Sequence, residues 1–195
     1  MYRYFLRHGV RPEELQDYRV VYVPLHMEPE AALLSVSPEF NNSMEMIAWI
    51  SKSLPVDTKI AIKEQPFSFG IRSKQYYDNL RRIPNVALAD PRVHSWDWIK
   101  AARVIATITG TVGIEAVYYG KPVLSFGKHQ SINRLPTVRF ADSFETTRKH
   151  VNELLELDLE ADEFAISKRA FSQAQLDTSF ELPGFESTHA SKSLQ

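Results

Sequence analysis

The chain of 195 residues contains no cysteine. This absence excludes disulfide bonds, thiolate metal ligands and cysteine nucleophiles. The chain also lacks any apolar run near the roughly 20 residues that a helix needs to cross a bilayer. A bias of charge is missing as well, because 23 basic and 24 acidic side chains leave a formal net charge of −1. We therefore expect a soluble cytoplasmic protein with no nucleic-acid partner, attached at most peripherally to a membrane.

Short apolar runs alternate along the chain with segments of helical spacing. Strands are expected at 20–25, 59–62, 85–89, 104–108, 122–126 and 138–141. Helices are expected at 38–54, 76–82, 95–102, 112–119 and 143–157. Continuous apolar runs are typical of strands buried on both faces, and this alternation predicts right-handed crossovers between parallel strands. The predicted fold is a Rossmann-like α/β domain, an open parallel sheet flanked by helices.

The ends of two expected helices carry recognisable signals. Ser95 is a candidate N-cap for the helix at 95–102, because its hydroxyl can accept from an amide of the first turn. Gly120 suits the position just after the helix at 112–119, where a left-handed backbone conformation commonly ends a helix.

The pattern also divides the chain. We expect the Rossmann-like domain to span 19–160 and a helical extension to follow at 161–186. The weakly patterned residues 1–18 are expected to be a linker or the end of a missing N-terminal domain. Residues 187–195 are polar and are expected to form a disordered tail.

The most informative motif is Thr109–Gly110–Thr111–Val112–Gly113, between a buried strand and a helix. Ligands of open α/β sheets bind outside the carboxyl ends of the strands, and the free amides and dipole of a helix N-terminus favour an anion. The glycines permit a close approach of the backbone, the threonines can donate hydroxyls, and Thr111 can also cap the helix. Glu115, one turn inside the helix, could accept from ribose hydroxyls. Alternatively, the glycines serve only packing and the threonines only capping.

Other polar residues are expected at the same sheet edge, where the strands at 20–25 and 59–62 end. His26 could bind a phosphate or a sugar carboxylate, and Lys63 could neutralise an anion. Gln65 could reach a base or sugar, and Pro66 would shape the loop. Taken singly, each of these residues is also compatible with a packing role. The spacing of histidines and carboxylates predicts no metal site, and no P-loop or nucleophile elbow is present.

Several segments resemble the capsule polysaccharide biosynthesis family and follow one another in the same order. They are VPLHMEP (23–29), KEQPFSFGIRS (63–73), NVALADP (85–91) and TITGTVGIEAVYYGKPVLSFG (107–127). The resemblance covers roughly positions 18 to 142. The family includes the Kdo transferases of capsule assembly. It implies the donor-binding half of a two-domain GT-B glycosyltransferase of capsule or surface polysaccharide biosynthesis.

The resemblance also implies roles for particular residues. Thr109, Thr111 and Gly113 would meet the donor phosphate, and Glu115 the ribose. The segment Lys63–Glu64–Gln65–Pro66 matches a Lys–Glu–His–Pro motif of the family. Gln65 replaces its histidine, and a neutral amide cannot become cationic or donate a proton near neutral pH.

The expected partners follow from this resemblance. The donor would be a nucleotide sugar bound as substrate, with a CMP-sugar such as CMP-Kdo favoured over a UDP-sugar and no separate cofactor. The acceptor would be a saccharide or glycolipid, and the protein would be cytoplasmic or peripheral at the inner face of the inner membrane. A separate N-terminal half or capsule-assembly proteins could complete the enzyme, whose catalytic base is not assigned on this chain. The alternatives are a sugar-nucleotide 2-epimerase-like protein and a non-catalytic nucleotide-binding or interaction module.

Overall fold

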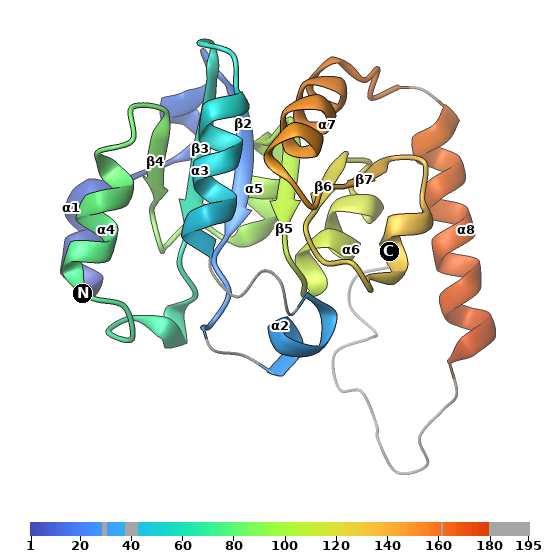
Figure 1. The fold of residues 1–195 in the computed structure, drawn as a ribbon, viewed down its shortest axis with the longest axis horizontal. Helices are drawn as coiled ribbons and strands as arrows, with labels where there is room; N and C mark the ends of the chain where they lie inside the picture. The colour runs from blue at the N-terminus through green and yellow to red at the C-terminus, as the bar shows by residue number, and fades with distance from the viewer. Residues whose placement is uncertain (29–30, 38–42, 161, 180–195) are drawn as a thin grey trace, which may run out of the picture.

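The computed structural model describes residues 1–28, 31–37, 43–160 and 162–179 of the chain (Figure 1). Within these ranges, all strands join one parallel sheet of seven strands in the order β1-β4-β3-β2-β5-β6-β7. The strands are β1 Gly9–Val10, β2 Arg19–Pro24, β3 Thr58–Lys63, β4 Val86–Ala89, β5 Val104–Thr107, β6 Val123–Ser125 and β7 Val138–Phe140. The chain winds outward from β2 to β3 and β4 on one side, and from β5 to β7 on the other. The neighbours β2 and β5 therefore mark the topological switch point, where ligands of open α/β sheets bind.

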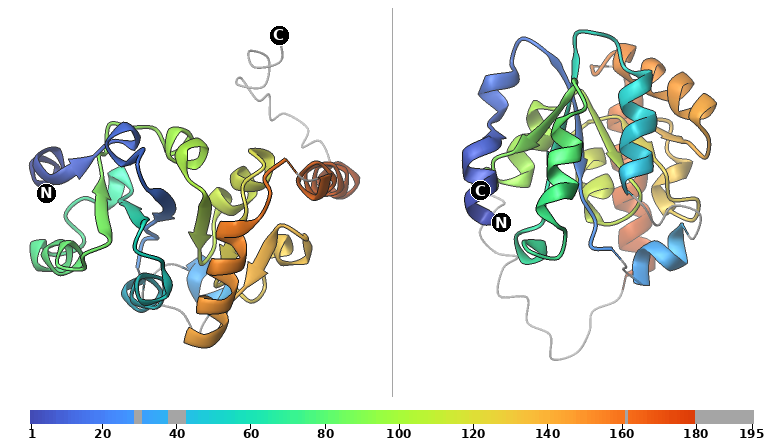
Figure 2. Two further views of the ribbon diagram at one scale, coloured as in Figure 1. Left: turned by 90° about the horizontal axis from the view of Figure 1, so that it is seen from above. Right: turned by 60° about the vertical axis from the view of Figure 1, so that its left-hand side comes forward.

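Helices cover both faces of the sheet (Figure 2). The α-helices are α1 Tyr2–His8, α2 Ala31–Val36, α3 Ser43–Ser53, α4 Lys74–Arg81, α5 Ser95–Ala101, α6 Thr111–Tyr118, α7 Phe144–Glu156 and α8 Asp162–Thr178. The short 3-10 helices are η1 Pro12–Leu15, η2 Pro66–Ser68 and η3 Ser131–Arg134. Helices α3, α4 and α7 pack on one face, and α5, α6 and α8 on the other. This arrangement confirms the predicted Rossmann-like α/β fold.

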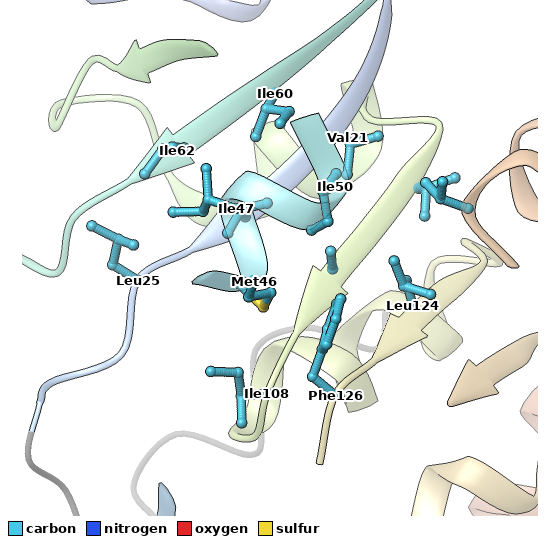
Figure 3. Close-up of a cluster of buried hydrophobic side chains, with 14 of the residues drawn as sticks. Val21, Leu25, Met46, Ile47, Ile50, Ile60, Ile62, Ile108, Leu124 and Phe126 are labelled. Atoms are coloured by element: carbon cyan, nitrogen blue, oxygen red, sulfur yellow. The ribbon is translucent and has the colours of Figure 1, made fainter. Parts of the chain in front are cut away.

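Strand β2 shows how the sequence produces two cores. Val21 and Val23 point to the face covered by α3, while Val20 and Tyr22 point to the face of α5. Figure 3 shows Met46, Ile47 and Ile50 of α3 lying over the first of these faces, in one buried cluster with the β-strand side chains. Each such aliphatic side chain contributes about 1.5–3 kcal/mol through burial. A strand buried on both faces must be apolar at every position, and this explains the continuous apolar run.

The predicted elements are present, and most of their ends differ by one or two residues. The helix expected from residue 76 begins at Lys74, because Ser73 caps it by accepting from the Tyr76 N–H at 3.3 Å. The expected N-cap Ser95 is wrong. His94 is the N-cap of α5, and its Nδ1 accepts from the Trp96 N–H at 3.2 Å. Gly120 has φ +64° just after α6, as predicted. Residues 38–42 of the helix expected at 38–54 lie outside the described residues.

Residues 1–18, expected as a linker or the end of another domain, pack on this sheet. Strand β1 pairs with β4, and the Asp90 N–H donates to the Val10 carbonyl at 2.8 Å. Phe5 of α1 is buried against Tyr77, with ring centroids 4.8 Å apart. Sequence periodicity missed this segment because a two-residue edge strand and one short helix are too brief to show a repeat.

The expected helical extension is α8, the red-orange helix at one side of Figure 1. Its residues Phe164 and Phe171 are buried, and Phe171 meets Tyr118 of α6 edge-on at 6.2 Å. The rest of the expected extension and the tail at 187–195 lie outside the described residues. None of the helices in the described ranges is long and apolar enough to cross a membrane.

Candidate functional site

An open pocket lies at the switch point, at the carboxyl ends of β2, β3 and β5. Its volume is about 320 Å³. Three loops line it: Pro24, Leu25, His26 and Met27 after β2, Gln65 and Phe67 after β3, and Thr109, Gly110, Thr111 and Val112 after β5. In Figure 1 these strand ends point downward, toward α2. The pocket thus brings together two strand-end loops and the turn that the sequence singled out separately.

The turn after β5 presents the N-terminus of α6 to this pocket. Gly110 is the N-cap residue, with φ +89° and ψ 177°, a conformation that favours glycine. Gly110 has no side chain to form a capping hydrogen bond, and helix α6 begins at Thr111. The expectation that Thr111 caps the helix is therefore wrong, since Thr111 is the first helical residue. First-turn amides have no partner inside the helix, so the backbone here can donate to an anion.

His26 holds this turn in place through the imidazole Nε2. That atom lies 2.8 Å from the Thr109 carbonyl oxygen and 3.2 Å from the Thr109 nitrogen. A protonated Nε2 donates to the carbonyl, and a bare Nε2 accepts from the N–H. The Thr107 hydroxyl also donates to the Thr109 carbonyl, at 2.6 Å. The peptide between β5 and α6 is thus fixed from two sides, and His26 lines the pocket while it clamps the turn.

Part of the pocket wall is apolar. Phe67 of η2 is 72% exposed, and Met27 after β2 is 37% exposed. Gln65 is half-buried and also lines the pocket. Exposed aromatic and thioether groups beside a polar turn suit a ligand with a flat apolar part attached to an anion.

Lys63 and Glu64, two residues of the matched motif, are used inside the fold. Lys63 Nζ donates to the Val93 carbonyl at 2.7 Å, away from the pocket lining, and burial lowers the pKa of its ammonium group. Glu64 is buried and accepts from the Gln65 N–H at 2.9 Å and the Tyr77 hydroxyl at 2.6 Å. Pro66 is exposed at the start of η2 and does not line the pocket. In this motif, Gln65 alone reaches the pocket.

Arg72 is a buried residue that sequence reasoning missed. Its guanidinium pairs with Glu64 at 2.8 Å and Glu28 at 3.4 Å, and also donates to the His26 carbonyl. Glu28 in turn accepts from the Ser43 N–H at 2.8 Å. This arginine therefore ties together the loops after β2 and β3 that form the pocket. Its only sequence signal was a charged residue in the stretch that resembles the family, since the pairing is not periodic.

Gly113 and Glu115 lie deeper along α6. A Cβ at Gly113 would lie 2.6 Å from Ile132 Cδ1, so this glycine allows close packing of α6 against the segment after β6. Glu115 is half-buried on the next turn, outside the lining of the pocket, and its charge contributes to the raised pKa of the buried Tyr22 phenol, which is raised mainly by burial. The described residues include no cluster of three or more histidine or carboxylate side chains placed to hold a metal ion.

The seven-stranded parallel sheet, with helices on both faces and a pocket at its switch point, defines one Rossmann-like half of a GT-B fold. The chain belongs to the capsule polysaccharide biosynthesis protein family, whose profile matches residues 9–157. Comparison with curated protein sequences gives no significant match.

Solved structures of two related kinds share the fold. The UDP-GlcNAc 2-epimerase from Methanocaldococcus jannaschii is 15% identical with a TM-score of 0.59, over 89% of this chain and 48% of that one. WaaG, a glycosyltransferase involved in lipopolysaccharide biosynthesis, is 16% identical with a TM-score of 0.51, over 91% and 46%. The spinosyn rhamnosyltransferase SpnG complexed with thymidine diphosphate is 13% identical with a TM-score of 0.54, over 83% and 45%. The chain spans less than half the length of these proteins.

Proposed function

We propose that the pocket at the β2–β5 switch point binds the phosphate of a nucleotide sugar. The chain then serves as the donor-binding half of a glycosyltransferase in capsule or surface polysaccharide synthesis. Membership of the capsule polysaccharide biosynthesis protein family supports this proposal, and so does a fold shared with glycosyltransferase halves.

One observation carries the proposal: the uncapped N-terminus of α6 lines an open pocket. The amides of Thr111 and Val112 belong to the first helical turn, and both residues line the pocket. Amides of a first turn attract an anion through hydrogen bonds and the helix dipole. The clamp of His26 and Thr107 on the Thr109 carbonyl keeps the turn rigid before a ligand arrives. Such preorganisation stabilises the negative charge that develops on a leaving phosphate.

The rest of the donor would extend along the apolar wall. Phe67 and Met27 offer a face for a base or sugar, and the Gln65 amide can donate or accept at the same wall. Glu115 is our candidate for the ribose hydroxyls, beyond the pocket on the next turn of α6. Structural neighbours are described with UDP-GlcNAc and UDP, or with thymidine diphosphate, and these names support a nucleotide ligand. The sequence resemblance to Kdo transferases favours a CMP-sugar among nucleotides.

In a complete enzyme, a base would activate the acceptor hydroxyl while this pocket holds the leaving nucleotide. The acceptor-binding site and the base would come from a second domain or partner chain, since the chain spans less than half the length of its structural neighbours. Docking at the inner face of the inner membrane would bring such an enzyme to a lipid-linked acceptor.

Thermal denaturation with CMP, UDP, GDP and ADP at millimolar concentration tests the proposal directly. We expect a cytidine or uridine nucleotide to raise the melting temperature, because a ligand that binds only the folded chain stabilises it. The absence of a shift with all four nucleotides contradicts the proposed donor site. Adding UDP-GlcNAc to the panel tests the epimerase-like alternative, which predicts a preference for that ligand over CMP.

A pair of substitutions at one position isolates the backbone donor. Thr111→Pro removes the first N–H of α6, where proline is well tolerated, and the preceding Gly110 has the extended ψ that a following proline requires. Thr111→Ala removes the hydroxyl and keeps the N–H. We expect Thr111→Pro to weaken nucleotide binding by about tenfold to a hundredfold, the effect of one hydrogen bond to a charged group. Equal binding by the two variants in calorimetry would place the ligand elsewhere.

A further inference from the structure

A second, larger pocket lies between helix α8 and the segment that follows β6. We call it the α8 groove, and its volume is about 710 Å³. Figure 1 shows α8 running beside this segment, which contains η3. The described residues that line the groove are Lys128, His129, Gln130, Ser131, Asn133, Arg134, Leu135, Ala170, Phe171 and Ala174. It shares no lining residue of the described chain with the switch-point pocket.

Side-chain bonds to the backbone hold the loop wall of the α8 groove. Asn133 Nδ2 donates to the carbonyls of Gly127 at 2.7 Å and Lys128 at 3.1 Å. Gln130 Nε2 donates to the Ile108 carbonyl at 2.6 Å. A Cβ at Gly127 would lie 2.1 Å from the Ile108 carbonyl oxygen. Only glycine therefore allows the loop to approach the end of β5 this closely. The groove therefore has a wall that is formed before any ligand binds.

The charge in the α8 groove is of one sign. Lys128 and Arg134 are exposed cations, His129 is a third basic side chain, and no carboxylate is among the described lining residues. The ion pairs of the described chain include neither Lys128 nor Arg134. This concentration is a local feature, because the chain as a whole carries 23 basic and 24 acidic side chains. The groove is thus complementary to an anion.

The opposite side of the α8 groove is apolar. Ala170, Phe171 and Ala174 of α8 supply it, and Leu135 continues it from the loop. Phe171 is held by Tyr118, whose hydroxyl donates to Gln175 of α8. Ala170 and Ala174 are exposed, so an aliphatic chain can pack against them in place of water.

From this combination we infer that the α8 groove binds a lipid phosphate, with the phosphate between Lys128 and Arg134 and the start of the acyl or prenyl chain against Ala170 and Ala174. Guanidinium and ammonium groups form charge-assisted bonds with phosphate oxygens. The volume also falls in the range of pockets that enclose a small ligand. This inference does not depend on the nucleotide site, because the two pockets are lined by different residues.

Calorimetry with soluble short-chain lipids tests the inference on the full chain. The probes are dihexanoyl phosphatidic acid below its micelle concentration, dihexanoyl phosphatidylcholine and inorganic phosphate. We expect the phosphatidic acid to bind at least about tenfold more tightly than the other two, because it alone offers both a dianionic phosphate and a chain. Equal affinity for inorganic phosphate would reduce the groove to a simple anion site, and equal affinity for the choline lipid would exclude recognition of the phosphate. Either result overturns the inference.

A matched pair of double variants locates the binding. Lys128→Ser with Arg134→Ser should weaken phosphatidic acid binding by about tenfold or more, through loss of two charge-assisted contacts. Lys168→Ser with Arg169→Ser removes the same charge from residues of α8 that do not line the groove, and should change the affinity by less than about twofold. Similar losses in both double variants would show general attraction to a basic surface and overturn the inference.

A single substitution on the apolar side gives an independent readout. Ala174→Glu places a carboxylate at an exposed position of α8 that tolerates any good helix former. It should abolish phosphatidic acid binding while the melting shift with nucleotides stays unchanged. Retention of lipid binding in this folded variant contradicts a ligand that lies along Ala174.

Discussion

Two segments at the carboxyl edge of the sheet were both candidates for ligand binding in the sequence, and they differ sharply in the structure. Lys63 ends β3 and Glu64 begins the loop after it, and the charged groups of both are bonded to protein atoms. The turn after β5 carries Gly110 and Thr111, whose helix N-terminus has no side-chain cap. The first is a closed loop and the second an open turn. A sequence motif alone does not distinguish a structural loop from a ligand site. The hydrogen-bond partners of its polar atoms in the structure do.

The closed loop has a plain physical task. A buried Glu64 must be paired to stay charged, and Arg72 pairs with it while donating to the carbonyl of His26. This network therefore fixes the positions of the loops that form the pocket walls. The open turn depends on that scaffold, because His26 is the residue that clamps Thr109.

The largest expected effect comes from breaking the closed loop. Arg72→Leu leaves the carboxyl group of Glu64 buried without its cation, and this should lower the free energy of unfolding by about 3–5 kcal/mol. Urea denaturation measures the change. Lys74→Leu is the matched control, since it removes an exposed i,i+4 pair with Asp78 that solvent screens, and its effect should be far smaller. Similar small losses in both variants would mean that the Glu64–Arg72 pair is not a scaffold.

Gly110→Ala tests the open turn through its backbone. At φ +89° and ψ 177°, an alanine should cost roughly 2–3 kcal/mol of stability and pull the α6 amides out of place. Gly120→Ala, at φ +64°, should cost about 1 kcal/mol and leave nucleotide binding intact. No described atom lies within 4 Å of a Cβ at Gly120, and His26 Nε2 lies 4.0 Å from one at Gly110, so backbone strain dominates both. Equal nucleotide affinity in the two folded variants would separate the turn from binding.

His26 connects the closed loop to the open turn, so its substitution tests the link between them. His26→Phe keeps an aromatic ring but removes the bond to Thr109, and should cost about 1–2 kcal/mol of stability and weaken CMP or UDP binding several-fold. His26→Gln retains an amide donor and should recover part of the affinity. A recovery of stability without recovery of affinity would favour direct contact between the imidazole and the ligand over a positioning role.

Sequence patterns predicted the open turn well and the closed loop poorly, for a physical reason. The turn Thr109–Gly110–Thr111 after a buried strand is predictable, because the φ of Gly110 and the start of the helix depend on residues that are neighbours in the sequence. The partners of Glu64 come from Arg72 and Tyr77, and only tertiary packing brings them together. The same reasoning applies to β1, whose two residues form a strand only by pairing with β4. Local geometry was readable, and the destination of each charged side chain was not.

The smallest expected effect concerns a third strand end, which belongs with the closed loop. Asp90 follows β4, and bonds from the Arg92 guanidinium at 2.6 Å and backbone N–H at 2.9 Å lower its pKa to about 2. An unfolded aspartate has a pKa of about 3.9. Because the folded pKa is the lower one, the stabilisation is complete above about pH 4 and is lost as the pH falls toward about 2.

Screening of the half-exposed Arg92 should keep this contribution below about 1 kcal/mol. Urea denaturation of the wild type and of Asp90→Asn at several pH values measures it, and the variant should show a flatter acid limb. Nucleotide affinity at neutral pH should be the same in both proteins, because Asp90 does not line the switch-point pocket. A loss of nucleotide binding in Asp90→Asn would extend the ligand site across β4 and make the contrast between closed and open strand ends too simple.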